Sequence, residues 1–173
     1  FHTFSKKFIL NFKKLQLSKF TKYKTVIMIG MGGSTLGSHS IYSFLKKKIS
    51  KKFIFFDNLD QIKIEQIKKK IKFQNTLFII ISKSGNTIET LVNCNLLKKK
   101  ITSKNSIIIT ELKDNLLHAF AKKKRILQIA HKNYIGGRYS VLSEVGMIPA
   151  YFMGLKVDKF RRNLLYFFNS KQN

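Results

Sequence analysis

Short apolar segments alternate with longer amphipathic segments along the chain. Five of the apolar segments are rich in Ile, Phe or Val and are bounded by polar residues, a pattern that is typical of β-strands. The predicted strands span residues 25–30, 53–57, 76–82, 106–110 and 126–130. Apolar residues at helical spacing predict helices over residues 5–20, 36–47, 60–72, 87–101, 114–123, 140–154 and 157–168. Strands and helices are therefore expected to alternate regularly.

Nearly continuous apolar strands that are separated by helices predict a parallel sheet covered on both faces. We therefore expect an α/β fold of the doubly wound type, in which a five-stranded parallel sheet is the middle layer of an αβα sandwich. At 173 residues the chain can bury the core of one such domain. In the flavodoxin-like strand order, strands one and three are neighbours, and ligands bind beyond their carboxyl ends.

The segment 82–87, with the sequence SKSGNT, lies between the third predicted strand and the next helix. It carries three hydroxyl groups, one ammonium group and one glycine. The N–H groups at a helix N-terminus and the positive end of the helix dipole favour an anion, and hydroxyl groups add donors that suit phosphate oxygens. The segment is therefore either a phosphate-binding loop or an ordinary Ser- and Thr-rich helix cap.

A second loop of this kind follows the first predicted strand, where residues 30–37 read GMGGSTLG. Glycines allow the backbone to approach a ligand closely, and Ser34 adds a hydroxyl group near the start of the next helix. In the flavodoxin-like order this loop and the 82–87 loop meet at one edge of the sheet. The two loops together predict a single phosphate-binding site.

Other phosphate-binding motifs fit the chain less well. A dinucleotide-binding fingerprint requires G-x-G-x-x-G, and Thr35 occupies the place of the third glycine. Asp57, at the end of the second predicted strand, could act as the ribose-binding acid, but this interpretation gives the 82–87 segment no role. A P-loop requires Lys after its second glycine, where this chain has Ser38.

The net charge of +26 raises the possibility of nucleic-acid binding. Lysine provides 30 of the 34 basic residues, however, and it occurs as triplets at the ends of predicted helices rather than as one stripe with interleaved aromatic residues. We interpret the lysines as a solvated surface that can attract an anionic substrate, and we expect no nucleic-acid partner. No apolar run reaches the roughly 18 residues of a membrane span, and the four histidines show no metal-ligand spacing.

A third loop follows the fifth predicted strand, and residues 136–146 read GGRYSVLSEVG. Arg138 comes directly after two glycines, so its guanidinium could stabilise a developing oxyanion; the alternative is an ion pair with a nearby carboxylate. Taken together and in this order, the segments 30–37, 82–90 and 136–146 resemble the glucose-6-phosphate isomerase (phosphoglucose isomerase) family. The resemblance covers residues 20–155.

The resemblance implies a sugar isomerase (SIS) domain over residues 21–155. It also implies that residues 1–20 form a leading helix and that residues 156–173 begin the connection to a missing second SIS domain. In the family, the first two motifs hold the sugar phosphate, and the arginine of the third stabilises an enediolate during aldose–ketose isomerisation. The phosphate-binding residues implied in this way are Gly33, Ser34, Ser82, Lys83, Ser84, Gly85, Asn86 and Thr87, and the implied catalytic residue is Arg138.

The reaction also requires a base at the proton that moves between C1 and C2. The family supplies this base from later motifs that do not occur here, and the family position that matches Glu144 is not the base. We therefore expect a fragment of a glucose-6-phosphate isomerase of glycolysis and gluconeogenesis. It would bind glucose 6-phosphate and fructose 6-phosphate without a cofactor or metal, but it would be inactive alone. The resemblance implies a cytoplasmic protein, homodimeric when complete, with no membrane partner. The main alternative is a stand-alone SIS module that binds a phosphosugar without isomerising it.

Overall fold

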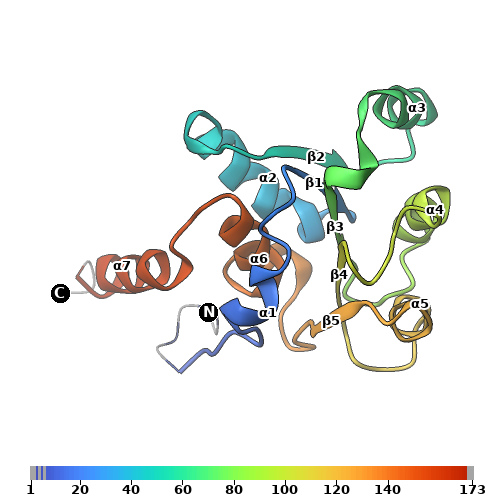
Figure 1. The fold of residues 1–173 in the computed structure, drawn as a ribbon. Coiled ribbons are helices and arrows are strands. Elements are labelled where there is room, and N and C mark those ends of the chain that lie inside the picture. Colours follow the sequence, from blue (N-terminus) through green and yellow to red (C-terminus); the bar gives the residue numbers. More distant parts are fainter. Residues whose placement is uncertain (1–2, 4, 6, 171–173) are drawn as a thin grey trace.

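Five parallel strands form one sheet in the order β2-β1-β3-β4-β5 (Figure 1). The computed structural model describes residues 3, 5 and 7–170. The strands are β1 Thr25–Ile29, β2 Lys52–Phe56, β3 Thr76–Ile81, β4 Ser106–Thr110 and β5 Leu127–Ala130. In the register, Ile29 lies beside both Phe56 and Ile80. The predicted flavodoxin-like order is confirmed, and the bounds of each strand differ by no more than one residue from the prediction.

Helices cover both faces of the sheet, which confirms the doubly wound α/β fold. Helices α1, α2 and α6 pack on one face, and α3, α4 and α5 pack on the other (Figure 1). The α-helices are α1 Lys14–Ser18, α2 Gly33–Leu45, α3 Gln61–Lys70, α4 Ile88–Leu97, α5 Leu116–Lys124, α6 Glu144–Phe152 and α7 Val157–Ser170. Short 3₁₀ helices are η2 Lys46–Lys48, η3 Phe73–Asn75 and η4 Gly137–Leu142.

The sheet separates two hydrophobic cores, and β1 contributes to both. Val26 and Met28 face the core that includes α1 and α6, whereas Ile27 and Ile29 face the core that includes α3, α4 and α5. All four side chains are fully buried. Successive side chains of a strand point to opposite faces, so a strand with helices on both sides must be apolar throughout. The same constraint explains the unbroken apolar run of β3.

The first helix is shorter than the prediction over residues 5–20. Helix α1 covers only Lys14–Ser18, and residue 6 of the predicted range lies outside the described residues. The preceding backbone is bonded to distant elements instead. The Asn11 N–H donates to the Glu144 carboxylate at 2.6 Å, and Arg161 of α7 donates to the Phe8 carbonyl at 3.3 Å. These long-range bonds replace the local i to i−4 bonds that a helix would need.

The helix predicted over residues 140–154 divides into η4 and α6. Ser143, in an extended conformation, separates them, and its hydroxyl group accepts the N–H of Val145 as an N-cap. Pro149 lies inside α6 and cannot donate to the Val145 carbonyl. The Ser38 hydroxyl of α2 donates to that carbonyl at 3.4 Å. This contact fastens α2 to α6 at the place where the proline leaves an acceptor unpaired.

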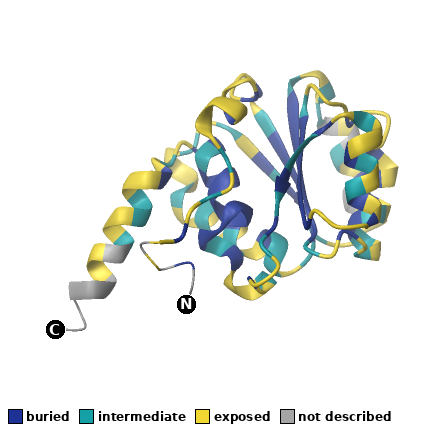
Figure 2. Cartoon of the chain, turned by 90° about the horizontal axis from the view of Figure 1, so that it is seen from below, coloured by how far each residue is buried: buried dark blue, intermediate teal, exposed yellow. Residues whose placement is uncertain are grey.

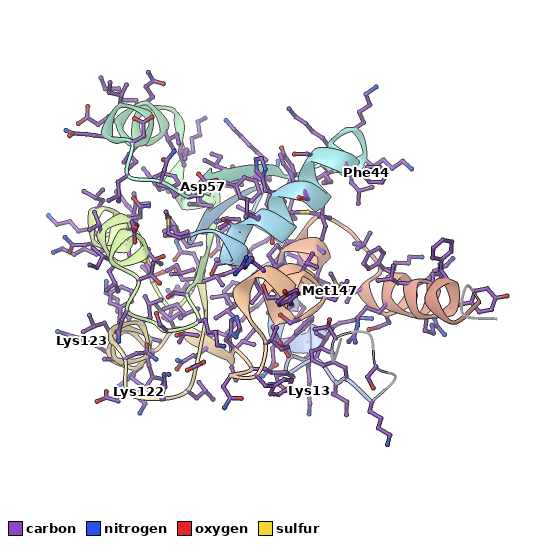
Figure 3. The ribbon with its side chains drawn as sticks, turned by 180° about the vertical axis from the view of Figure 1, so that it is seen from behind. Lys13, Phe44, Asp57, Lys122, Lys123 and Met147 are labelled. Carbon is purple, nitrogen blue, oxygen red and sulfur yellow. The ribbon has the colours of Figure 1, made fainter. Side chains whose placement is uncertain are left out.

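Helix α7 extends away from the sheet (Figure 2), and Val157, Phe160 and Leu164 pack it against the body of the molecule. Val157 is buried, and it shares a small cluster with Met147 of α6, which is labelled in Figure 3. The segment 156–173, predicted to begin a connection to another domain, is thus mainly helical, and residues 171–173 lie outside the described residues.

Candidate functional site

The loops after β1 and β3 lie side by side at the carboxyl edge of the sheet. A Cβ atom added to Gly30 would lie 2.7 Å from the Ile81 carbonyl oxygen and 3.1 Å from the Ser34 Cβ. Ser34 therefore lies next to the carboxyl end of β3, where the second loop begins. Because real Cβ atoms essentially never approach a backbone oxygen so closely, only glycine fits between the two loops.

Helix α2 begins three residues earlier than predicted, which places Ser34 in its first turn. Its N-cap is Gly32, whose φ of 51° favours glycine. The N–H groups of Gly32 and Gly33 have no acceptor within the described part of the chain. The first loop thus presents a hydroxyl group and backbone donors at a helix N-terminus, which suits an anion.

The hydroxyl groups of the second loop form a cluster at the N-terminus of α4. The Ser82 and Thr87 hydroxyl oxygens are 2.9 Å apart, and the Ser84 hydroxyl lies 3.5 Å from that of Thr87. The Gly85 N–H donates to the Ser82 hydroxyl at 3.1 Å. The three hydroxyl groups of this segment therefore lie close together at the start of α4.

Thr87 occupies the N-cap position of α4, but its side chain does not cap the helix. The N–H groups of residues 87–90 therefore have no acceptor among the described residues. The first N–H groups of a helix are normally satisfied by a cap, by water or by a ligand. An ordinary Ser- and Thr-rich cap would leave fewer donors unpaired, so the geometry favours the interpretation as an anion-binding loop.

Asn115, in the turn between β4 and α5, packs against the second loop. The sequence alone did not point to this residue. Asn115 is buried, and its amide nitrogen donates to the carbonyls of Glu111 and Lys113 at 3.0 Å each. A Cβ atom added to Gly85, whose φ is 71°, would lie 1.8 Å from the Asn115 amide oxygen. The available signal was an Asn directly before an apolar helical run, which is a typical N-cap.

Two predicted phosphate-binding residues direct their side chains elsewhere. The Asn86 amide oxygen accepts the N–H of Leu116 at 3.0 Å and so caps α5. The Lys83 ammonium donates to the Asn133 carbonyl at 2.6 Å and lies 3.9 Å from the Glu111 carboxylate. Their described contacts hold the second loop against α5 and the third loop, and a direct role for either side chain in phosphate binding stays a prediction.

The third loop joins the site by direct contact with the first. A Cβ atom added to Gly33 would lie 2.2 Å from the Gly137 carbonyl carbon and 2.8 Å from the Arg138 nitrogen. The Ser140 hydroxyl lies 2.6 Å from the Gly137 carbonyl oxygen and 3.2 Å from that of Gly33, so it ties the two loops together. Arg138 is thereby fixed beside the first loop.

The Arg138 side chain is exposed, and no described residue forms an ion pair or hydrogen bond with its guanidinium. The alternative of an ion pair with a nearby carboxylate is therefore not observed within residues 7–170. The unpaired guanidinium of Arg138 and the unpaired N–H groups of the first loop both favour binding of an anion at this edge of the sheet.

The buried ionisable groups of the third loop and its neighbours are engaged by protein partners. The Glu144 carboxylate is fully buried and accepts from the Lys132 ammonium at 2.8 Å. The hydrogen bond from Lys113 lowers the pKa of Glu111. Burial lowers the pKa of His131, which keeps its imidazole neutral near pH 7. The partners of Glu111, His131 and Glu144 are therefore other protein groups, and none of the three is identified as the base that moves a proton.

The described residues contain no group of three or more His, Cys, Asp or Glu side chains that could hold a metal ion. Among these residues, too, no helix has the length and apolar character needed to cross a bilayer. Burial raises the pKa of the Cys94 thiol to about 12, so this cysteine behaves as an inert apolar side chain. Asp57 of the rival dinucleotide motif lies at the carboxyl end of β2 (Figure 3).

Comparison with known proteins decides between the motifs. The family model for phosphoglucose isomerase matches residues 4–165. The chain belongs to the phosphoglucose isomerase family. A relative in this family, the glucose-6-phosphate isomerase of Methanocaldococcus jannaschii, is 37% identical over 140 residues, which cover 79% of this chain and 35% of the relative. The chain thus spans about a third of the length of the curated relatives that it matches.

Solved structures agree with this assignment. The phosphoglucose isomerase fold of this chain superimposes on a glucose-6-phosphate isomerase from Chlamydia trachomatis with a TM-score of 0.71 and 26% identity, covering 86% of this chain and 29% of the other. The Vibrio vulnificus NanR protein complexed with ManNAc-6P superimposes with a TM-score of 0.53 at 18% identity. The match covers 92% of this chain and 55% of the NanR chain, and it shows a shared fold alone. The predicted family and fold are confirmed.

Proposed function

We propose that this chain forms the phosphosugar-binding part of a glucose-6-phosphate isomerase, an enzyme that interconverts glucose 6-phosphate and fructose 6-phosphate. The observation that carries this proposal is the meeting of three loops at one edge of the sheet in a member of the phosphoglucose isomerase family. The first two loops contribute hydroxyl groups and unpaired N–H groups, and the third contributes an unpaired guanidinium.

The sugar phosphate binds between the N-termini of α2 and α4 in this proposal. Ser34, Ser82, Ser84 and Thr87 donate hydroxyl hydrogen bonds, and the unpaired N–H groups of both helices add further donors. Helix dipoles favour the dianionic phosphate at both termini. The high positive charge of the whole chain assists by raising the local concentration of the anionic substrate.

Arg138 acts on the reacting carbons. A proton moves between C1 and C2, and the intermediate is an enediolate with negative charge on oxygen. A fixed guanidinium beside that oxygen stabilises the charge as it develops. Gly33 and Ser140 contact the backbone that carries Arg138, so they help to position the guanidinium.

We infer that the base comes from residues beyond this chain, since Glu111, His131 and Glu144 are all engaged in the scaffold. The complete enzyme would be a cytoplasmic homodimer without a nucleic-acid or membrane partner, as family membership implies. The chain by itself would then bind the substrate and turn it over hardly at all.

A second candidate is a phosphosugar-binding module that regulates rather than isomerises. The engagement of the buried carboxylates favours it, because binding needs no base. The exposed, unpaired Arg138 favours the isomerase, because phosphate binding alone is already served by the loops after β1 and β3.

Calorimetric titration of the 173-residue chain with glucose 6-phosphate tests the proposal. Replacing the Ser82 and Thr87 hydroxyls, as Ser82→Ala with Thr87→Val, should weaken binding by about ten- to a hundredfold per lost hydrogen bond to charged phosphate. Thr102→Ala, which removes an exposed hydroxyl bonded to Asn105 away from the site, is the matched control and should change nothing. Undiminished binding by the double variant would rule out the proposed site.

A coupled isomerase assay separates the two candidates. The isomerase proposal expects activity to appear when the missing part of the enzyme is supplied as a second polypeptide, and to be lost with Arg138→Lys, since lysine lacks the planar fork of arginine. Restored activity that is insensitive to this substitution contradicts the role of Arg138.

A further inference from the structure

A cavity lies at the amino edge of the sheet, opposite the edge that carries the three loops. Its volume of about 730 Å³ falls in the size range of small-molecule sites. One wall comes from the segment before β1 and from the turn between α2 and β2, where Thr21, Lys48 and Lys51 line it. The other wall comes from the end of α6 and the start of α7. The length of the strands therefore separates this cavity from the candidate phosphosugar site.

Cationic side chains greatly outnumber carboxylates in the lining of this cavity. The cations are Lys14, Lys48, Lys51, Lys156, Lys159 and Arg162, and the single carboxylate is that of Asp158. Asp158 forms an ion pair with Lys14. Among the described residues, no carboxylate lies within ion-pair distance of the other five cations. Like charges that surround one cavity repel one another, and a bound anion would remove this repulsion.

Lys51 is held in a fixed position at the cavity wall. Its ammonium donates to the Thr21 carbonyl at 2.5 Å and also to the Tyr23 carbonyl. Partial burial lowers the pKa of Lys51, because loss of water disfavours the charged form. The two carbonyls solvate the ammonium but do not neutralise it. This wall therefore carries a positioned, partly desolvated cation without a counterion.

The end of α6 gives the cavity an apolar surface beside the cations. Phe152 and Met153 are buried, and Tyr151 is half-buried. Ligand sites commonly combine an apolar lining with a few charged groups that fix the orientation of the ligand. The cavity thus suits an anion that has room for a planar or apolar part.

We propose that this cavity binds an oligophosphate group, a short linear chain of phosphates that is either free or part of a nucleotide. An elongated anion can contact Lys48 and Lys51 on one wall and Lys159 and Arg162 on the other, whereas a single phosphate would leave most of the cavity empty. The guanidinium of Arg162 can bind phosphate oxygens in a bidentate manner. The inference goes beyond the proposed activity and does not depend on it.

The density of positive charge favours phosphates over the carboxylates of an acidic protein segment. A phosphate group carries up to about two negative charges, and a carboxylate carries one. Phosphates therefore neutralise more cations within a cavity of limited size.

Calorimetric titration of the 173-residue chain with inorganic tripolyphosphate at about 0.15 M salt tests the site. Lys159→Gln with Arg162→Gln removes two exposed cations of the cavity and should weaken binding by about tenfold or more, because hydrogen bonds to charged phosphate are lost. Lys122→Gln with Lys123→Gln is the matched control. It removes the same net charge from the exposed end of α5 (Figure 3) and should leave the affinity nearly unchanged. Equal losses for the two double variants would overturn the proposal.

NMR titration with tripolyphosphate locates the ligand. The backbone amide shifts should cluster on residues 48–51 and 154–162. They should persist in the variant Ser82→Ala with Thr87→Val, which lacks hydroxyl groups of the candidate phosphosugar site, so this result stands or falls separately from the proposed function. Shifts confined to Ser34 and residues 84–90 would place the ligand in the phosphosugar site and overturn the inference.

Two further ligands distinguish the sources of the phosphate chain. Tighter binding of ATP than of tripolyphosphate would indicate a nucleotide, with its base on the apolar surface of residues 151–153, and equal affinities would indicate a free oligophosphate. Tighter binding of hexaglutamate than of tripolyphosphate would show that the cavity takes an acidic protein segment. That result, or no binding of tripolyphosphate at millimolar concentration, would overturn the proposal.

Discussion

The loop after β3 and the segment 131–144 lie at the same edge of the sheet but are stabilised in different ways. In the loop after β3, the hydroxyl groups contact one another over at most five positions of the chain, as in the Ser82–Thr87 hydrogen bond. Glu144 of the second bonds to the Asn11 N–H, 133 positions away. The first region, the proposed phosphate-binding loop, is built from local contacts, whereas the second is a scaffold that depends on the whole fold.

The largest effect should come from the scaffold. Glu144→Ala removes the acceptor of the Lys132 ammonium, which is only 10% exposed, and should destabilise the chain by about 3–5 kcal/mol because a buried charge is left uncompensated. The free energy of unfolding in urea measures this change. Lys14→Ala breaks the exposed pair with Asp158 and should cost less than about 1 kcal/mol. Similar losses for both variants would show that Glu144 has no special place in the fold.

The junction of the first and third loops should be nearly as sensitive. Gly33→Ala places a methyl group against the Gly137 backbone and should destabilise the chain by about 1–3 kcal/mol while displacing Arg138. Gly136→Ala is the control, since its added Cβ would meet only the Tyr139 ring at 3.4 Å. Thermal unfolding of both variants makes the comparison, and a harmless Gly33→Ala would contradict the close approach of the two loops.

Asn115 links scaffold and loop, so its replacement should affect both stability and binding. Asn115→Ala removes the acceptor of the His118 N–H at the start of α5 and the support of Gly85, and a loss of about 1–2 kcal/mol in stability is expected. Asn115→Asp keeps an acceptor for the His118 N–H but lacks the amide donors to Glu111 and Lys113, and it adds a negative charge behind the second loop. Calorimetry should therefore show weaker sugar-phosphate binding for Asn115→Asp than its stability loss explains. If Asn115→Asp bound the sugar phosphate as tightly as the unmodified chain, Asn115 would have no role in shaping the second loop.

The smallest expected effect is a pH dependence from His131. Because burial lowers its pKa, the unfolded chain binds a proton more readily than the folded chain just below the ordinary value of about 6.5. Stability should therefore be unaffected above that value and should fall as the pH drops below it. His131→Gln should flatten the dependence between about pH 6.5 and pH 5, whereas His39→Gln, at an exposed position, should leave it in place. Unfolding free energies across this range measure the difference.

The sequence predicted the sheet well because each strand is short, apolar and bounded by polar residues, as in β4, whose bounds match the prediction fully. It predicted the loops after β1 and β3 because their chemistry lies in consecutive residues. It did not reveal that Ser143 would divide the helix predicted over 140–154, or that Asn86 would cap α5 rather than face a ligand. The Asn86 cap joins residues 30 positions apart, which local periodicity cannot encode. The Ser143 cap is a local contact with Val145, but the apolar spacing of the segment did not mark it.

The non-helical course of residues 7–13 has the same origin. Their pattern of apolar residues suits a helix, but Phe8 is held between the Lys132 ammonium and the Arg161 guanidinium, 4.8 and 4.9 Å from its ring centre. Two cations from distant parts of the chain thus contact this segment and help to hold it in a non-helical course.

The joint binding of one sugar phosphate by the loops after β1 and β3 is tested most directly by NMR titration of the backbone amides with glucose 6-phosphate. We predict that the largest shifts fall on Gly33, Ser34 and residues 84–90, with glucose alone producing none of them. Shifts confined to one of the two loops, or centred on residues away from this edge of the sheet, would contradict the account.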